Sequence, residues 1–397
     1  PSFDIGQRFY SAVAQFDYQE NAQHDMLPVH QFRLNPARFF LTDPVLDFTI
    51  VSVEPSSDKG KSLTEYPWIQ MICQSGKAEP GDPINIINGN VTVSATDYQS
   101  VGPDILSFTR FYNSFGQSRS SLGLGWQSNF DSRLINDGFG SVYIIRYDGF
   151  EYHFTQSAGV WSSADHDVDG QLTTDGATIW TFKGLDDVTD VFDYTTGRLK
   201  SITTRSGYVQ NLIYDASGHL ATVTDSYNRT LTFTFVNGVL QSMSDPDGRT
   251  YTYAYSNVVL LTPTLLTSVT YPGTAPNPEV QYLYENPSFP AALTGIIDEN
   301  NNRISSWTYD SQKRAITDQR GSSADALSVS YNINLSGYGT VTLTNALNKQ
   351  SIYTIGFDAA LPRLDKIAQQ ASSSTPAATS TVSYDSNRYI SQRVGNN

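Results

Sequence analysis

Apolar and polar residues alternate along much of the chain, in short runs separated by Gly, Asn, Asp and Pro. The segment 46–53 alternates in this way and predicts a half-buried strand. The segment 84–93 holds two β-prone runs around Asn88-Gly89, a pair typical of the turn in a β-hairpin. No stretch shows the 3.6-residue apolar period of an amphipathic helix. The pattern therefore predicts an all-β protein, with a small β-rich module over 1–80.

An internal repeat with steps of 21 and 20 residues runs through the middle of the chain. Gly-x-Leu recurs at 197–199, 218–220 and 238–240, and an aromatic residue, often followed by Asp, precedes each copy. Each unit predicts a β-hairpin with one turn at the Gly and a second turn such as 245–248. Because a single hairpin is marginal in water, we expect the units to stack into one long sheet that curls over its apolar face. The predicted structural anchors are Phe192, Asp193, Gly197, Leu199, Tyr214, Asp215, Gly218, Leu220, Gly238, Leu240, Tyr309, Asp310, Tyr384 and Asp385.

Composition and charge argue against nucleic acid as a partner and against a membrane span. The chain has 397 residues, with 39 Asp and Glu against 25 Lys and Arg, a net charge of -14. Because Lys and Arg are scattered singly, nucleic acid is not expected as a partner. No apolar run approaches the roughly 20 residues that cross a bilayer, so no membrane span is expected. The single cysteine, Cys73, excludes an intrachain disulfide and lies in an apolar run typical of a buried strand.

The repeat units resemble the tyrosine-aspartate (YD) repeats of Rhs proteins, which run Tyr-Asp, three residues, Gly-Arg-Leu, then Val/Ile-Thr-Asp. Residues 214–225 match this pattern almost position for position. Upstream, the segments 81–90, 108–114 and 123–130 resemble, in the same order, the segments that open the repeat region in many bacterial Rhs proteins. The resemblance spans about 81–390 and divides the chain into a region preceding the repeats, 81–190, and a YD-repeat region, 191–397. Its upstream residues, to which the resemblance gives a structural role, are Gly81, Asp82, Pro83, Gly89, Asn90, Arg110, Tyr112, Asn113, Gly123, Gly125 and Trp126.

The resemblance implies a β-sheet strip that, in complete family members, spirals into a hollow cocoon around a C-terminal toxin. It therefore implies a non-catalytic shell segment, bacterial and secreted or exposed on the cell surface, whose partners are the remainder of the shell and a toxin cargo. The chain is shorter than a closed cocoon usually needs, and the export signal and the toxin are expected elsewhere. An open sheet edge after residue 390 predicts that the chain assembles with copies of itself, docks on a partner, or aggregates.

A second hypothesis is an extracellular adhesion or glycan-binding module. Tyr251, Tyr253 and Tyr255 alternate with smaller residues, so they line one face of a strand. Such a row is either a platform for sugar rings or the inner packing layer of the sheet. A shell segment is expected to associate with other chains or a cargo, whereas an adhesin is expected to bind sugars or cells.

Several acidic residues are candidates for chemistry. Asp165, Asp167 and Asp169, followed by Gly170, form the D-x-D-x-D-G opening of a calcium loop, although the closing Glu of such a loop is missing. A solvated acidic turn explains the same three residues, so calcium stays an alternative and no other cofactor is expected.

Asp186, Asp187 and Asp190 are either glycosidase carboxylates or turn caps. The run 245–248, Asp-Pro-Asp-Gly, sits where the repeat needs a turn, which is the alternative to a self-cleavage role. The sequence holds no nucleophile elbow, zinc-protease motif or phosphate-binding loop. We therefore predict that the chain is not an enzyme.

Overall fold

The computed structural model describes the strands at 13–16, 30–33, 40–43 and 48–51 and the residues 84–102, 104–116, 119–164, 168, 170–256, 264–321, 326–334, 338–358, 361–371, 376–385 and 390–396. These residues form strands, turns and irregular segments, so the predicted all-β fold is confirmed. Among them no helix is long and apolar enough to cross a membrane. The chain separates into two compact units, one of Pro1–Ile72 with Phe357–Arg363 and one of Cys73–Gly356 with Leu364–Asn397.

The first unit contains two antiparallel strand pairs. Strand β1 (Val13–Phe16) pairs with β2 (His30–Arg33), and β3 (Phe40–Asp43) pairs with β4 (Phe48–Val51). Strand β4 lies inside the segment predicted as a half-buried strand. Cys73 and residues 81–83 lie outside the described residues.

The second unit opens with three small sheets. A three-stranded sheet has the order β5 (Thr92–Gln99), β6 (Ser107–Asn113), β9 (Trp126–Ser128). Strands β7 (Arg119–Ser120) and β8 (Gly123–Leu124) form a pair. The four-stranded sheet consists of β10 (Arg133–Asn136), β11 (Ser141–Ile145), β12 (Glu151–Ser157) and β13 (Val160–Ser163).

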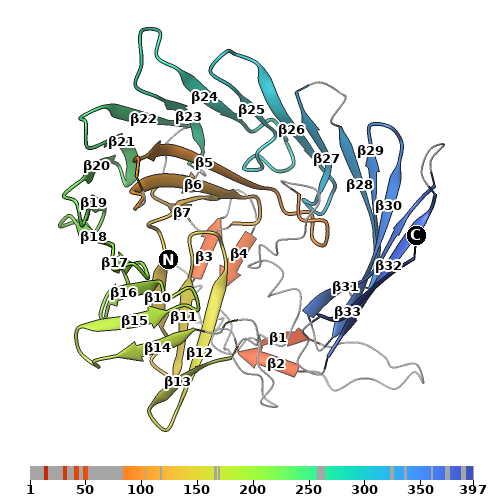
Figure 1. Cartoon of the computed structure of the whole chain (residues 1–397), viewed down its shortest axis with the longest axis horizontal. Coiled ribbons are helices and arrows are strands. Elements are labelled where there is room, and N and C mark those ends of the chain that lie inside the picture. Colours follow the sequence, from red (N-terminus) through yellow and green to blue (C-terminus); the bar gives the residue numbers. More distant parts are fainter. Residues whose placement is uncertain are drawn as a thin grey trace, which may run out of the picture. The chain divides into compact units, whose positions relative to one another are not determined.

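The remaining described strands, β14 to β33, form a 20-stranded antiparallel sheet in chain order. Figure 1 shows them following one another along one curved sheet, from yellow-green to blue. The strands are β14 (Gln171–Thr174), β15 (Ile179–Lys183), β16 (Thr189–Asp193), β17 (Leu199–Thr203), β18 (Val209–Tyr214), β19 (Leu220–Asp225), β20 (Thr230–Val236), β21 (Val239–Ser244), β22 (Thr250–Tyr255), β23 (Leu266–Thr270), β24 (Glu279–Leu283), β25 (Gly295–Ile297), β26 (Arg303–Tyr309), β27 (Ala315–Arg320), β28 (Leu327–Ile333), β29 (Gly339–Asn345), β30 (Gln350–Asp358), β31 (Leu361–Gln369), β32 (Ala378–Tyr384) and β33 (Ile390–Asn396).

Alternation along the strands explains which face is buried. On β22 the side chains of Tyr251 and Tyr253 are 6% and 1% exposed, while those of Thr250, Thr252 and Ala254, which alternate with them, are exposed. Because side chains on a strand alternate between the two faces, one face of the sheet is apolar. The buried tyrosines therefore form the packing layer, which was one of the two alternatives for this row.

The segment 84–93 departs from the predicted hairpin. Ile84 and Val91 form a single isolated bridge, and the strand β5 begins only after it. The side-chain oxygens of Asn85 and Asn88 accept hydrogen bonds from the N–H groups of Ile87 and Asn90, at 2.9 Å each. Asparagine favours such turns because its side chain bonds the backbone two residues on. The chain therefore reverses at Asn88-Gly89, as predicted, but a single antiparallel bridge joins the two arms in place of two paired strands.

Candidate functional site

A buried ion pair lies at the centre of the three-stranded sheet. Arg110 on β6 and Asp97 on β5 have fully buried side chains, and two hydrogen bonds join them, Nε to Oδ2 at 2.7 Å and Nη2 to Oδ1 at 2.8 Å. Burial on its own lowers the pKa of Arg110, but the charge and hydrogen bonds of Asp97 raise it well above its ordinary value. Arg110 is therefore a permanent cation in the protein interior, and its charge is balanced by Asp97.

Two tyrosines of the 20-stranded sheet complete this cluster. Tyr253 on β22 donates its hydroxyl to Asp97 Oδ2, and Tyr271, which follows β23, donates to Asp97 Oδ1, both at 2.9 Å. Burial and then the charge of Asp97 raise the pKa of both phenols, so they remain protonated donors. The guanidinium of Arg110 lies 5.1 Å from the ring centre of Trp126 and 5.3 Å from that of Tyr282. The cluster thus fastens the three-stranded sheet to strands β22–β24.

Tyr112 and Trp126 join the three-stranded sheet to residues 284–293 through a second set of hydrogen bonds. The Tyr112 hydroxyl accepts a hydrogen bond from the N–H of Leu293 at 2.9 Å and donates to the carbonyl of Ala291 at 3.2 Å. Trp126 donates its indole N–H to the Tyr284 hydroxyl at 3.0 Å. Both rings are buried, at 1% and 0% exposed. The upstream residues singled out in the sequence thus hold the region before the repeats against the sheet.

The upstream segments contact the same sheet at Gly89 and beside Gly123, while Asn90 and Asn113 bond within the upstream region. The carbonyl of Gly89 accepts the N–H of Ala315 on β27 at 2.9 Å, and a Cβ at Gly89 would lie 2.4 Å from the Cβ of Arg314. Thr264 accepts the N–H of Leu124 at 2.8 Å next to Gly123. Within the segment, Asn90 Oδ1 accepts the hydroxyl of Ser114 at 2.9 Å, and the carbonyl of Gly125 accepts the N–H of Asn113 at 2.8 Å.

The aspartates of the repeats cap their own turns. Three turns make the full set of bonds. In each, Oδ1 of the aspartate accepts the backbone N–H groups of the second and fourth residues after it, and Oδ2 accepts a hydrogen bond from Nε of an arginine at that fourth position. This arginine bond is 2.6 Å for Asp225–Arg229, 2.7 Å for Asp245–Arg249 and 2.8 Å for Asp310–Arg314. Asp215 pairs in the same way with His219, at 3.4 Å. Asp193 accepts N–H groups of Thr195 and Thr196, and Asp385 directly follows β32.

The tyrosines of the repeats bond to the hairpin before their own. In each case the hydroxyl donates to a main-chain carbonyl 15 to 20 residues earlier, at 2.6–2.9 Å. The pairs are Tyr214 to Leu199, Tyr255 to Leu240, Tyr309 to Leu293, Tyr331 to Ala315 and Tyr384 to Leu364. Four of the donors, Tyr214, Tyr255, Tyr309 and Tyr384, stand at a β-bulge. Phe192 and Phe235 stand at the same kind of bulge without a hydroxyl to donate.

The aspartates predicted at 186–190 lie in different environments. Asp190 on β16 is 7% exposed, and Nη1 of Arg146 lies 3.8 Å from its Oδ2. Burial raises the pKa of Asp190 to about 6, and Arg146 offsets only part of this effect. Asp186 accepts the N–H of Val188 in a turn, and Asp187 pairs with Lys183 at 2.8 Å. Asp186 is a turn cap, while Asp190 is a buried strand residue that neither alternative anticipated.

The calcium candidates Asp165, Asp167 and Asp169 lie outside the described residues. Within the described part of the chain, no group of three or more His, Cys, Asp or Glu residues is arranged to hold a metal ion. Calcium binding at 165–170 therefore stays a prediction.

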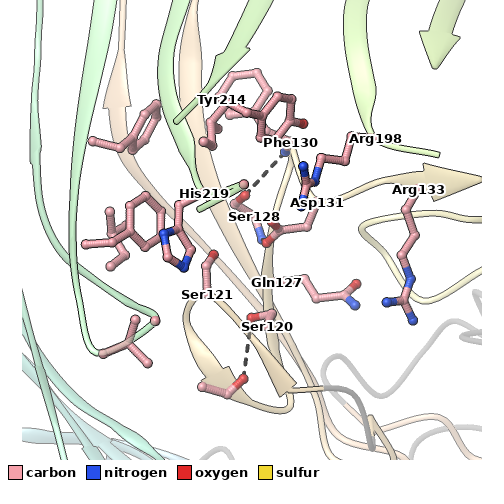
Figure 2. A pocket seen from close by; sticks show the side chains of 18 of the residues that line it. Ser120, Ser121, Gln127, Ser128, Phe130, Asp131, Arg133, Arg198, Tyr214 and His219 are labelled. Carbon is pink, nitrogen blue, oxygen red and sulfur yellow. Dashed lines mark hydrogen bonds between the residues drawn. The ribbon is translucent and has the colours of Figure 1, made fainter. Parts of the chain in front are cut away.

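A cavity of about 560 Å³ lies where the segment 120–133 meets the repeat hairpins from Arg198 to Leu240. Figure 2 shows Arg133 and Arg198 on one side of it, His219 on the other, and Ser121 and Gln127 nearby. Aromatic rings, among them Phe130, Tyr214 and Phe235, supply apolar wall. The volume is in the range of small-molecule sites, and convergent polar groups with aromatic walls are typical of them. Several repeat anchors also line it: Tyr214, Gly218, Leu220, Gly238 and Leu240.

Comparison with known proteins gives one family match. Residues 81–154, about a fifth of the chain, match a family described as a domain of unknown function, DUF6531. This span contains the buried pair Arg110–Asp97 and ends within β12. No curated protein matches the chain.

Solved structures of toxin complexes are similar at low identity. A crystal structure of TcdB2-TccC3-Cdc42 shares 13% identity and a TM-score of 0.32, over 97% of this chain and 18% of the other. One of TcdB2-TccC3-TEV shares 13% identity and a TM-score of 0.27, over 99% and 20%. A structure of a Photorhabdus luminescens Tc holotoxin pore shares 14% identity and a TM-score of 0.25, over 79% and 16%. This chain spans at most a fifth of the length of these three structures.

Proposed function

We propose that the chain is a non-catalytic wall segment of an Rhs-type β-shell that encloses a toxin or effector polypeptide. The observation that carries the proposal is the 20-stranded sheet in which repeat tyrosines bond to the preceding hairpin. The resemblance of 214–225 to the YD repeat and the DUF6531 match over 81–154 support it.

The mechanism proposed is steric enclosure. A wall that sequesters a polypeptide must present few openings and must resist local unfolding, because a frayed strand exposes both the cargo and an aggregation-prone edge. The capped turns and the tyrosine bonds supply this resistance in each hairpin, since each satisfies backbone groups that a loosened hairpin would expose to water.

Partners and location follow from the proposed role. The edge strands β14 and β33 end the sheet in the described part of the chain. We infer that the remainder of a shell, in the same polypeptide or another, pairs with an edge strand. The same role places the protein outside the bacterial cytosol or on the cell surface after export.

The test is the intact mass of the native gene product in its source cells, with everything that copurifies. The proposal expects a product well above 43.8 kDa, or one of 43.8 kDa that copurifies with further shell and a cargo polypeptide. A product of 43.8 kDa that purifies alone as a monomer would contradict it.

A further inference from the structure

The chain contains two Asn-Gly pairs, at 88–89 and at 237–238, and they lie in different environments. In such a pair the backbone nitrogen of the glycine can attack the side-chain amide of the asparagine, because glycine has no Cβ to obstruct the approach. The attack needs a glycine N–H that no acceptor holds, and room for the asparagine to turn toward it. The hydrogen bonds and burial of each pair therefore decide which of them reacts.

The first pair is held by hydrogen bonds on both sides. The N–H of Gly89 donates to the carbonyl of Asn85 at 2.7 Å, and its carbonyl accepts the N–H of Ala315 on β27 at 2.9 Å. The Oδ1 atom of Asn88 accepts the N–H of Asn90 at 2.9 Å. Gly89 is buried. Because the attacking nitrogen is already bonded and the segment is packed against β27, several hydrogen bonds must break before Asn88 can react.

The second pair forms the exposed turn between β20 and β21 (Figure 1). Val236 and Val239 pair across the turn, and the φ angles of 53° at Asn237 and 81° at Gly238 are typical of a type I′ turn. Both turn residues are exposed. In the described part of the chain, no hydrogen bond engages the N–H of Gly238 or the side chain of Asn237.

Space and water are both present at this turn. A Cβ placed at Gly238 would find no atom within 4 Å. Asn237 borders two cavities, of about 560 Å³ and 290 Å³, so water reaches its side chain. A two-residue turn at the tip of a hairpin also opens locally at a lower cost than a buried segment. The turn thus leaves both reacting groups accessible, which the loop at 84–91 does not.

We propose that Asn237 is a site of spontaneous deamidation in the folded protein. The Gly238 nitrogen, after losing its proton to solvent, attacks Cγ of Asn237. The bond from Cγ to the side-chain nitrogen breaks, and ammonia leaves a five-membered succinimide ring. Water then opens the ring at either carbonyl carbon, which yields aspartate or isoaspartate. Water is the one co-reactant, and nothing is oxidised or reduced. The inference goes beyond the proposed wall function and does not depend on it.

The product changes both the charge and the backbone of the turn. Either product places a new carboxylate on a turn that borders the 560 Å³ cavity. Isoaspartate also adds a methylene group to the main chain, so two residues no longer span the turn with type I′ geometry. We therefore expect isoaspartate at 237 to loosen the pairing of Val236 with Val239.

The test is incubation of the whole chain at pH 9 and 37 °C, followed by peptide mass spectrometry at both pairs. Deamidation raises the mass of a peptide by about 1 Da, and isoaspartate and aspartate peptides separate by chromatography. We expect Asn237 to convert about tenfold faster than Asn88, or more, because the turn opens at lower cost than the bonded loop. In urea the two rates should agree within about twofold, because the fold that separates them is lost.

Gly238→Ala is the matched variant, because its methyl group obstructs the attacking nitrogen. We expect it to slow conversion of Asn237 about tenfold, while Asn88 in the same molecule keeps its slow rate. The Asn88 rate reports whether the variant is still folded, since unfolding would accelerate it. No conversion of Asn237 in the folded chain, while the urea sample converts, overturns the proposal. Equal rates at Asn237 and Asn88 in the folded chain overturn it as well.

Discussion

The clearest prediction about stability concerns Asp190, because burial disfavours the ionised form of its carboxyl group. The carboxyl group is buried on β16, and Nη1 of Arg146 lies 3.8 Å from its Oδ2, which is longer than a hydrogen bond. Replacing Asp190 by Asn keeps the shape of the side chain and removes the charge. We expect Asp190→Asn to stabilise the protein at neutral pH.

The magnitude follows from the pKa shift. The pKa of Asp190 rises from its ordinary 3.8 to about 6 in the folded state. Between these values the folded state keeps a proton that the unfolded state has released, so the free energy of unfolding falls as pH rises. Since one pKa unit corresponds to about 1.4 kcal/mol, the penalty is about 1 kcal/mol at pH 4.5 and roughly 3 kcal/mol at pH 8.

Urea unfolding of both proteins at pH 4.5 and pH 8 measures this difference. The gain from Asp190→Asn should be about 1 kcal/mol at pH 4.5 and approach 3 kcal/mol at pH 8. Asp247→Asn is the control, because Asp247 is an exposed aspartate with a 3.0 Å contact to Arg249, and its effect should stay within about 0.5 kcal/mol. If Asp190→Asn destabilises the protein at pH 8, Asp190 is an ionised partner that Arg146 needs, and the reasoning is refuted.

Three further predictions concern the fastenings of the sheet, and urea unfolding at pH 7 measures each. Tyr309→Phe leaves the buried carbonyl of Leu293 without its donor at 2.6 Å and should lower the free energy of unfolding by about 1–3 kcal/mol. If the free energy of unfolding does not change, the tyrosine hydrogen bonds do not stabilise the sheet. Gly197→Ala should be more harmful than Gly248→Ala: both have a positive φ, but a Cβ at 197 meets a carbonyl oxygen at 1.8 Å, whereas nothing lies within 4 Å at 248. Equal losses of unfolding free energy in the two alanine variants would contradict this prediction. Arg110→Met leaves a buried carboxylate without its cation and should cost about 3–5 kcal/mol; a loss below about 1 kcal/mol would mean that the cluster is not closed to water.

Much of the repeat architecture could be predicted from the sequence, because its determinants are local. Tyr214, Asp215 and Gly218 lie within five residues of one another, and the turn that they specify depends on backbone geometry that each copy repeats. The loop at 84–93 shows the limit of such reasoning. Asn88-Gly89 is typical of a tight two-residue hairpin turn, but the Asn85 side chain bonds the N–H of Ile87, and the chain closes with one bridge between Ile84 and Val91.

The sequence identified some of the residues that join one sheet to another, but not their partners. Arg110 and Trp126 stood out by resemblance, yet the partner of Arg110, Asp97, occupies an ordinary position on a strand and carries no pattern. The tyrosines stood out as well, but their acceptors are backbone carbonyls, which every residue has. Arg133 and Arg198 form an isolated backbone bridge although they are 65 positions apart in sequence, and only the tertiary fold brings them together.

The central claim is that the repeats form a wall around a polypeptide. Protease protection of the native gene product, purified with whatever it carries, tests this claim most directly. The account predicts that a polypeptide distinct from the repeats survives protease while the wall is folded, and is digested once urea unfolds the wall. Digestion of every segment outside the repeats at equal rates in both conditions, with no protected polypeptide, would contradict it.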